Sequence, residues 1–356
     1  MAGRCLWGED VWAPLCACLR ASQRGCALHC SPSRSHPMPP VLTGLTELHR
    51  HLDGSLRPDT LHQLRAAAGF PPVSTPRFRP GMGLTAALQC FTHTLEALQT
   101  PAALRRVAAE CCEDAIAEGI GHLELRFAPQ LHTFGAVGDV VDCVLEGVAG
   151  RAGIILCGLY GESPALLEAL VEAARDRSGV VGLDLAGGPL PDHRYGLVDY
   201  AVAYTEAGRI GLGRTVHAGE GRPPNEIVQA VEVLGADRIG HGLTVLDSER
   251  AVALLVERGV VIEACPTSNW HVGLLDAPDE HPLARWLEVG LSVAVCTDNT
   301  LMSAVDLPVE LARIGAEPGT EPWDRLQAGA RRGWFLRGPA RPRASGGVED
   351  GLPTAQ

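Results

Sequence analysis

The stretch that decides the fold is GRTVHAGEGRPPNEIVQAVEVLGADRIGHG, residues 213–242. A short β-rich run occupies 213–220, a segment with helical periodicity occupies 225–235, and a second β-rich run occupies 238–242. Strand, helix and strand within about thirty residues predict a parallel βαβ unit.

The same alternation continues on both sides of this unit. We expect further strands at 45–52, 122–129, 153–161, 180–187, 260–269 and 291–300, and further helices at 101–118, 164–177 and 248–258. Eight strands separated by helices predict an α/β fold, a closed (β/α)8 TIM barrel. The long gap after the first strand holds two or three apparent helices between Pro58 and Glu118. A segment inserted there lies at the C-terminal face of a barrel, where it can cover a pocket.

The two ends of the chain differ from its middle. We expect residues 41–336 to form a single barrel domain and residues 1–40 to be a disordered or non-native N-terminal extension. Met38 opens a Pro-rich lead-in to the first strand, so translation beginning at Met38 is one interpretation of this extension. Residues 337–356 are rich in Pro, Gly and Arg, and we expect a disordered tail there.

Charge and hydropathy narrow the class of partner. The 356 residues carry a formal net charge of -12, and no basic stretch with interleaved aromatic residues occurs, so we expect no nucleic-acid partner. No apolar run approaches the roughly 20 residues that cross a bilayer, and the apolar run at 11–19 contains a proline, which makes it a poor signal peptide. We therefore expect a cytoplasmic protein that acts on a small neutral molecule. The sequence does not set its oligomeric state.

Five side chains suited to metal or acid–base chemistry lie at strand ends. His49 and His51 are separated by one residue inside the first expected strand, so their side chains point the same way. His217, His241 and Asp298 lie at the ends of the fifth, sixth and eighth expected strands. In a barrel these ends surround one mouth, so the five side chains come together there.

A set of imidazoles and one carboxylate suits zinc, in a site that leaves one position open to water. Iron, manganese or cobalt could substitute. Binuclear hydrolases on similar barrels often bridge two ions with a carboxylated lysine, but all 30 basic residues of this chain are arginine. The sequence therefore predicts a single divalent ion, Zn2+.

Two nearby residues have two interpretations each. Glu220 follows His217 by three residues, and burial beside a bound heterocycle could raise its pKa and make it a proton donor. Alternatively, Glu220 stabilises the start of the helix that follows through the helix dipole. His241 is either a fourth nitrogen ligand or a group that orients or deprotonates the metal-bound water.

Seven stretches, in order, resemble the adenosine deaminase family, and the resemblance extends from about residue 41 to about residue 310. They are ELHRHLDGSL at 47–56, LRFAPQLHT at 125–133, DLAG at 184–187, HAGE at 217–220, RIGHG at 238–242, EACPTSN at 263–269 and TDN at 297–299. One such motif would be weak, whereas the ordered series is specific.

The resemblance implies a role for each site residue. It implies metal ligation by His49, His51, His217 and Asp298, proton donation by Glu220, and a place beside the attacking water for His241. Asp53 and His51 would face the sugar side of the substrate, and the backbone at Gly187 would meet a purine nitrogen. The implied reaction is hydrolytic deamination of adenosine and 2'-deoxyadenosine, in which activated water adds to C6, Glu220 protonates N1 and ammonia leaves.

Three departures from the family pattern bear on the substrate. Asn299 stands where many members have a second aspartate, and it is expected to face N7 of the purine, to which an amide can donate without first being protonated. The sequence AGGP at 186–189 lacks the acidic residue that is common after this glycine in the family. The region past residue 310 is short.

Other functions stay open at this point. The substrate could be adenine itself or another adenosine-like amine, such as an aminofutalosine of menaquinone synthesis. A 5'-phosphate is disfavoured because Asp53 would repel it. A barrel that binds a ligand without catalysis is a further alternative, against which the intact set of ligands and Glu220 argues.

Overall fold

Eight parallel strands form the barrel in this computed structural model, which describes residues 43–189 and 193–335. Each strand pairs with the next one along the chain, in the order β1 to β8. The strands are β1 (Leu45–His51), β2 (Ile120–Phe127), β3 (Gly153–Leu159), β4 (Val180–Ala186), β5 (Gly213–Ala218), β6 (Arg238–His241), β7 (Val261–Ala264) and β8 (Ser292–Val295). The expected (β/α)8 barrel is thereby confirmed.

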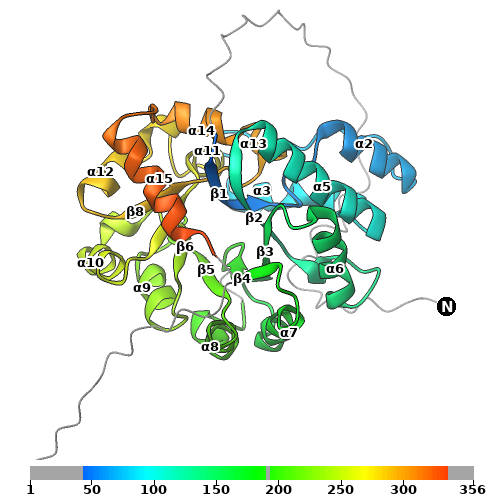
Figure 1. The fold of residues 1–356 in the computed structure, drawn as a ribbon, viewed down its shortest axis with the longest axis horizontal. Helices are drawn as coiled ribbons and strands as arrows, with labels where there is room; N and C mark the ends of the chain where they lie inside the picture. The colour runs from blue at the N-terminus through cyan, green and yellow to red at the C-terminus, as the bar shows by residue number, and fades with distance from the viewer. Residues whose placement is uncertain (1–42, 190–192, 336–356) are drawn as a thin grey trace, which may run out of the picture.

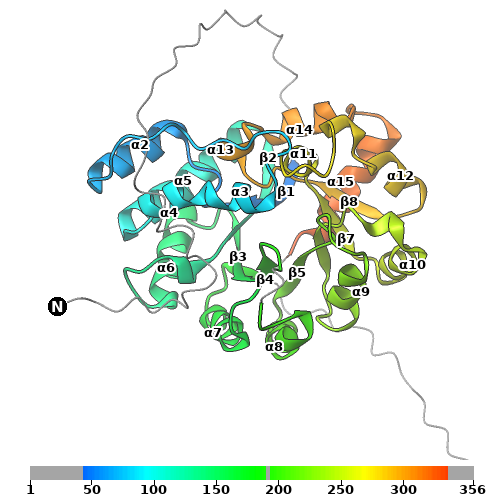
Figure 2. The same cartoon turned by 180° about the vertical axis from the view of Figure 1, so that it is seen from behind.

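Helices surround the strands (Figures 1 and 2). Those that follow strands β2 to β7 are α6 (Val137–Val148), α7 (Pro164–Ala174), α8 (Ala201–Arg209), α9 (Asn225–Glu232), α10 (Glu249–Arg258), α11 (Pro266–His271) and α12 (Leu283–Glu288). After β8 come α13 (Thr300–Ser303), α14 (Leu307–Arg313) and α15 (Glu321–Gly333). Four 3-10 turns complete the described elements: η1 (Pro129–Leu131), η2 (Leu197–Tyr200), η3 (Val245–Asp247) and η4 (Pro278–Glu280).

The segment inserted between β1 and β2 contains four helices, more than the two or three that the sequence suggested. They are α2 (Pro58–Ala67), α3 (Leu84–Gln89), α4 (Phe91–Ala97) and α5 (Pro101–Ala117). Pro58 and Pro101 each open a helix, at a position where the missing N–H costs no hydrogen bond. Thr100 caps α5 by accepting a hydrogen bond from the Ala103 amide.

The first and last strands meet at the C-terminal end of the barrel. β8 ends at Val295, and the chain then bends so that Asp298 forms a bridge with β1. The Asp298 amide donates to the His49 carbonyl over 2.8 Å, and the His51 amide donates to the Asp298 carbonyl over 2.8 Å. The seam of the sheet is thus joined by three residues that the sequence analysis assigned to a metal site.

The barrel interior carries charges, while the apolar core lies between the strands and the outer helices. Arg126, Arg238, Glu124 and Glu263 are all fully buried inside the barrel. Arg238 donates to Glu124 over 2.6 Å, and Arg126 donates to Glu263 over 2.8 Å. Burying ions is costly unless each one is paired, and here each guanidinium lies against a carboxylate.

A phenylalanine fills the N-terminal end of the barrel, at the opposite end of the strands from the site where β1 and Asp298 meet. A methyl group on Gly213 would come within 2.3 Å of the Phe335 ring, and one on Gly182 within 2.9 Å. The Arg238 guanidinium lies 3.6 Å from the centre of the same ring. The two glycines therefore make room for this ring at the base of β4 and β5.

Several expectations fall on residues outside the described ranges. The N-terminal extension 1–40, the start at Met38 and the tail at 337–356 all lie there, so these remain predictions. Within the described residues, no helix has both the length and the apolar character needed to cross a membrane.

Candidate metal centre and active site

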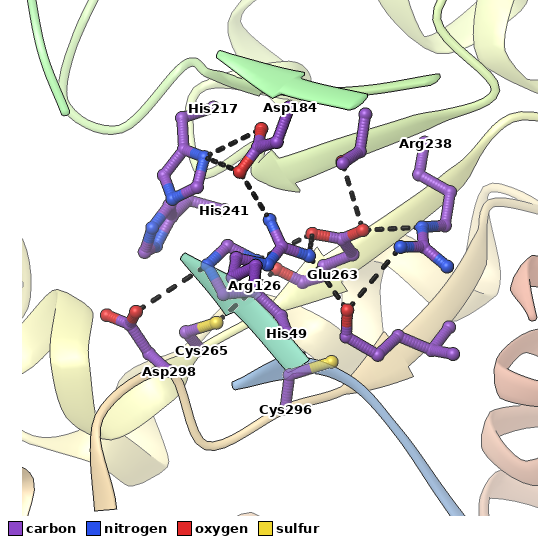
Figure 3. Close-up of polar contacts among 12 residues, drawn as sticks. His49, Arg126, Asp184, His217, Arg238, His241, Glu263, Cys265, Cys296 and Asp298 are labelled. Carbon is purple, nitrogen blue, oxygen red and sulfur yellow. Dashed lines mark hydrogen bonds and ion pairs between the residues drawn. The ribbon is translucent and has the colours of Figure 1, made fainter. Parts of the chain in front are cut away.

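The side chains selected from the sequence gather at the C-terminal ends of the strands. His49 and His51 come from β1, His217 from β5 and His241 from the last position of β6. Asp298 lies just past β8, at the seam with β1. Figure 3 shows four of these side chains, His49, His217, His241 and Asp298, turned toward a common centre.

Three imidazoles and a carboxylate lie within reach of one ion. Ligand atoms of His49, His51 and His217 all lie within 4.8 Å of one another. Asp298 Oδ1 is 3.5 Å from His49 Nε2 and 3.4 Å from His51 Nε2. His51 Nε2 is also 3.4 Å from His217 Nε2. The predicted ligand set is therefore brought together by the fold.

Buried carboxylates fix which nitrogen of each imidazole faces the centre. His49 Nδ1 lies 2.6 Å from Glu263 Oε2, and His217 Nδ1 lies 3.1 Å from Asp184 Oδ2 (Figure 3). Although burial by itself works to raise the pKa of both carboxyls, Arg126 and the imidazoles outweigh it and hold both pKa values well below the ordinary range. Both groups are thus carboxylates that accept the Nδ1–H, which leaves Nε2 as a lone-pair donor.

The donor set fits a divalent cation such as zinc. His49 Nε2 is buried without a hydrogen-bond partner, as expected of an atom whose natural partner is a metal. Burial lowers the pKa values of His51 and His217, which favours the neutral imidazole that a metal requires. Burial would raise the pKa of Asp298, but the neighbouring imidazoles hold it well below its ordinary value.

A cavity that is open to solvent lies beside this cluster. One side is polar and is lined by Gly187, Glu220, His241 and Asn299, as well as by ligand residues. The other side is apolar and comes mainly from the segment inserted after β1, whose lining residues are Phe78, Leu84, Ala87, Leu88 and Phe91. The inserted segment therefore forms a wall of the pocket.

Glu220 has the environment of a proton donor. It is buried beside His241, with Oε1 3.7 Å from His241 Nε2. Burial raises the pKa of Glu220 to about 7, against a smaller opposing effect of Arg222. Because α9 begins only at Asn225, five residues later, Glu220 does not lie in the first turn of that helix. The helix-dipole interpretation of this residue is therefore not supported.

Helix α11 holds two of the functional groups in place. Ser268 donates to Asp298 Oδ2 over 2.5 Å, and Asn269 Nδ2 lies 3.3 Å from His241 Nδ1. Glu310 of α14 accepts a hydrogen bond from the Thr267 amide at the start of α11. One short helix thus orients both the carboxylate and the histidine.

Like the predicted ligand His49, Asp53 is a predicted site residue that does not line the cavity. It follows β1 by two positions and is 6% exposed, and its Oδ1 is buried without a hydrogen-bond partner. Burial raises the pKa of Asp53 to about 7. The structure therefore places this carboxyl near the ligand strand but behind the cavity wall.

The chain matches a known protein family over most of its length. The model of the family described as adenosine deaminase matches residues 44–348 of the chain. The chain belongs to the adenosine deaminase family. This adenosine deaminase family member is thus a hydrolytic enzyme that removes an amino group at a C–N bond, as the sequence motifs implied.

Two relatives illustrate the similarity within the family. A probable adenosine deaminase of Dictyostelium discoideum is 34% identical over 287 residues, which cover 74% of this chain and 36% of that protein. The adenosine deaminase of Enterococcus faecalis is 33% identical over 287 residues, which cover 75% of this chain and 84% of the relative. The chain thus spans about a third of the first protein's length and most of the second's.

Solved structures share the fold at lower identity. An amidohydrolase from Burkholderia ambifaria with bound Zn is 24% identical, with a TM-score of 0.70 over 83% of this chain and 86% of that one. The adenine deaminase of Arthrobacter aurescens is 22% identical, with a TM-score of 0.66 over 81% and 98%. The N6-methyl-AMP deaminase of Arabidopsis thaliana is 23% identical, with a TM-score of 0.70 over 82% and 92%. These likenesses support the barrel fold alone.

The residues that support the ligands of this deaminase family member were not identified from its sequence. Asp184, Glu263 and Arg126 were quoted inside the family motifs but received no role. The signal was present, because each is a charged residue inside a strand that is expected to be buried, and such a residue needs a buried partner. Ser268 and Asn269 gave no comparable signal, since both residue types are common in loops.

Proposed function

We propose that this chain deaminates a 6-aminopurine nucleoside, converting adenosine or 2'-deoxyadenosine and water to inosine or 2'-deoxyinosine and ammonia. The proposal includes one divalent ion, zinc, with His49, His51, His217 and Asp298 as its ligands. The family membership gives the reaction class, and the arrangement of groups around the cavity supports the choice of a purine.

The main support for this proposal is the order of these groups around the barrel. Taken by strand, Gly187 follows β4, Glu220 follows β5, His241 ends β6 and Asn299 follows β8. Along the edge of a purine, the atoms run N3, C2, N1, C6, C5 and N7. A purine with N1 at Glu220 and C6 near His241 therefore presents N3 to Gly187 and N7 to Asn299. The four cavity groups and the atoms they would meet follow the same order.

The chemistry divides between the ion and the chain. A divalent ion held by this ligand set would lower the pKa of a water toward neutrality, which supplies hydroxide for attack at C6. Glu220, with a pKa of about 7, holds a proton that it can place on N1. His241 and Asp298 are positioned to hold the proton of the attacking water. The Asn299 amide donates to N7 without having to be protonated.

In this proposal, Asp53 is the residue that recognises the sugar of the substrate. Its unpaired carboxyl oxygen favours a hydroxyl donor over a phosphate, which would be repelled. Because Asp53 lies behind the cavity wall rather than in it, a substrate without a sugar is the second candidate. That substrate is adenine, the compound named for the Arthrobacter aurescens structure.

One panel of substrates tests the proposal. Ammonia release would be measured from adenosine, 2'-deoxyadenosine, adenine, AMP and N6-methyl-AMP, with the metal content determined on the same sample. We expect the two nucleosides to react at the highest kcat/KM with one zinc per chain. Faster reaction of adenine would replace the first candidate by the second, and inertness toward all five compounds with the metal bound would reject both.

A further inference from the structure

Glu310 is a buried carboxyl outside the cavity that the proposed mechanism does not use. It lies on α14, and its side chain is fully buried. Its Oε1 accepts a hydrogen bond from the Thr267 amide over 2.7 Å, and its Oε2 accepts one from the Thr267 hydroxyl. Taking a carboxyl out of water is costly unless its oxygens are bonded. Here both oxygens are bonded to one residue of α11.

The start of α11 depends on this carboxyl for a cap. Cys265 precedes the helix, and its side chain makes no hydrogen bond to the first turn. The first amides of a helix have no partner inside the helix. Pro266 has no N–H, so the Thr267 amide is the first that needs an acceptor. Glu310 therefore provides, from another helix, the acceptor that a capping side chain usually provides.

The hydroxyl of Thr267 is held from two sides. Arg313 Nη1 donates to Thr267 Oγ1 over 2.7 Å, and the same oxygen donates to Glu310. A hydroxyl has one hydrogen to donate, so it can satisfy the carboxylate and accept from the guanidinium at the same time. Both the backbone and the side chain of Thr267 are thus bonded to α14, which fixes the place and the rotation of the first turn of α11.

The two residues that follow Thr267 contact groups of the proposed reaction. Ser268 donates to Asp298 Oδ2 over 2.5 Å, and Asn269 Nδ2 lies 3.3 Å from His241 Nδ1. Because α11 has only six residues, a shift at its start moves both contacts together. A misplacement of about 1 Å in a reacting group can cost on the order of 100-fold in rate.

We propose that Glu310 is a positioning residue for deamination, which acts through the first turn of α11. It holds Thr267, and the two side chains that follow then hold Asp298 and His241 in the orientation that the reaction needs. The inference rests on the proposed function, because it uses the roles given there to these two groups. Glu310 does not line the cavity, so it acts by orientation and not by contact with the substrate.

A comparison of kcat with KM tests the proposal. Glu310→Gln keeps the size of the side chain but replaces one acceptor by an N–H donor, which would face a hydroxyl that already accepts from Arg313. In the zinc-loaded protein we expect kcat for adenosine to fall about tenfold or more. KM should change by less than about threefold, because no contact with the substrate is removed.

A matched control separates positioning from loss of stability. Ser248 caps α10 by accepting a hydrogen bond from the Ala251 amide over 3.2 Å, and it does not line the cavity. Ser248→Ala removes this cap, so we expect it to lower Tm while kcat and KM stay as in the wild type. An equal fall in kcat in Ser248→Ala and Glu310→Gln would show that lost stability alone slows turnover, and it would overturn the proposal.

A double-mutant cycle tests the path of the effect. Ser268→Ala combined with Asn269→Ala removes both contacts through which Glu310 would act. In that background we expect Glu310→Gln to change kcat by less than about twofold, since no side chain is left for α11 to place. A further tenfold loss would mean that Glu310 acts by another route, which would overturn the proposal.

Cobalt provides a measurement that needs no turnover. Cobalt bound in place of zinc absorbs visible light, and its bands depend on the arrangement of its ligands. We expect Glu310→Gln to shift these bands in the same direction as Ser268→Ala, because both loosen Asp298, and Ser248→Ala to leave them unchanged. Wild-type kcat and an unchanged cobalt spectrum in Glu310→Gln would overturn this inference alone. A zinc-loaded wild type that releases ammonia from no nucleoside would overturn the proposed function, while the cobalt spectra would still report whether Glu310 places Asp298.

Discussion

Glu220 combines two features that a proton donor requires, a place in the cavity wall and a carboxyl that keeps its proton near neutral pH. Glu220→Gln preserves the shape and the hydrogen-bonding reach of the side chain but removes the transferable proton. We expect kcat to fall by about 10²- to 10⁴-fold while one metal ion per chain is retained. Turnover and metal content measured on one preparation check this, and near-normal turnover would remove Glu220 from the role.

The pKa of Glu220 also sets a direction for the pH dependence. The active form carries the proton, so it predominates below a pKa of about 7 and is lost as the pH rises through that value. We expect kcat/KM to decline by about tenfold per pH unit on the alkaline side. A pH profile would show this limb in the wild type, and its persistence in Glu220→Gln would assign it to another group.

Glu263 acts on the metal through His49 rather than by touching it. Removing its charge weakens the hold on His49 Nδ1, so we expect Glu263→Gln to lower metal affinity by about 10- to 100-fold. Competition with a coloured chelator measures the change. Glu124→Gln is the matched control, because Glu124 is equally buried but accepts a hydrogen bond from Arg238 instead of an imidazole. An equal loss of affinity in both variants would point to general disruption.

The close contact between helices α5 and α6 depends on one glycine. A methyl group on Gly147 of α6 would lie 2.4 Å from the Arg105 carbonyl oxygen of α5, and a backbone atom cannot move aside. We expect Gly147→Ala to destabilise the fold by about 1–3 kcal/mol. Thermal or denaturant unfolding would measure this.

The control for that prediction lies in the same helix. A methyl group on Gly138 would meet the guanidinium of Arg177 at 2.8 Å, the far end of a flexible side chain. Gly138→Ala should therefore leave stability within about 0.5 kcal/mol of the wild type. If both substitutions cost the same, the close approach of the two helices is not what limits position 147.

The order of strands and helices could be predicted from the sequence. A parallel strand that is buried on both faces needs a run of apolar residues, as at 153–159 and 180–186, and such runs are easy to recognise. The histidines were located by the same logic, since barrel strand ends converge. Sequence reasoning placed Asp298 at the end of a strand, whereas β8 ends three residues earlier and Asp298 reaches the site by bridging to β1. Arg126 and Glu263 went unassigned because the pairing of two buried charges from distant strands depends on the closed barrel.

The proposed metal would join parts of the barrel that few backbone hydrogen bonds connect. The ligands come from β1, β5 and the loop after β8, and the seam between β1 and that loop depends on backbone hydrogen bonds made by His51 and Asp298. Binding to the native state alone adds about 2.7 kcal/mol at a hundredfold excess over Kd. We therefore expect chelation to lower Tm and to speed hydrogen exchange at the His51 and Asp298 amides more than at the amides of β3. Uniform exchange across the sheet after chelation would contradict this.

His241 and Asp298 share a backbone feature with a cost of its own. Both have positive φ angles, 62° and 61°, in the left-handed region where a side chain is disfavoured and glycine is at ease. Each side chain is needed for the reaction, yet its backbone conformation is strained, which costs about 1–3 kcal/mol of folding free energy per residue. Replacing either residue by glycine would therefore relieve backbone strain and favour thermal stability, but it would remove a group that turnover needs. In a descendant protein that no longer deaminates, we expect these two positions to be among the first to change.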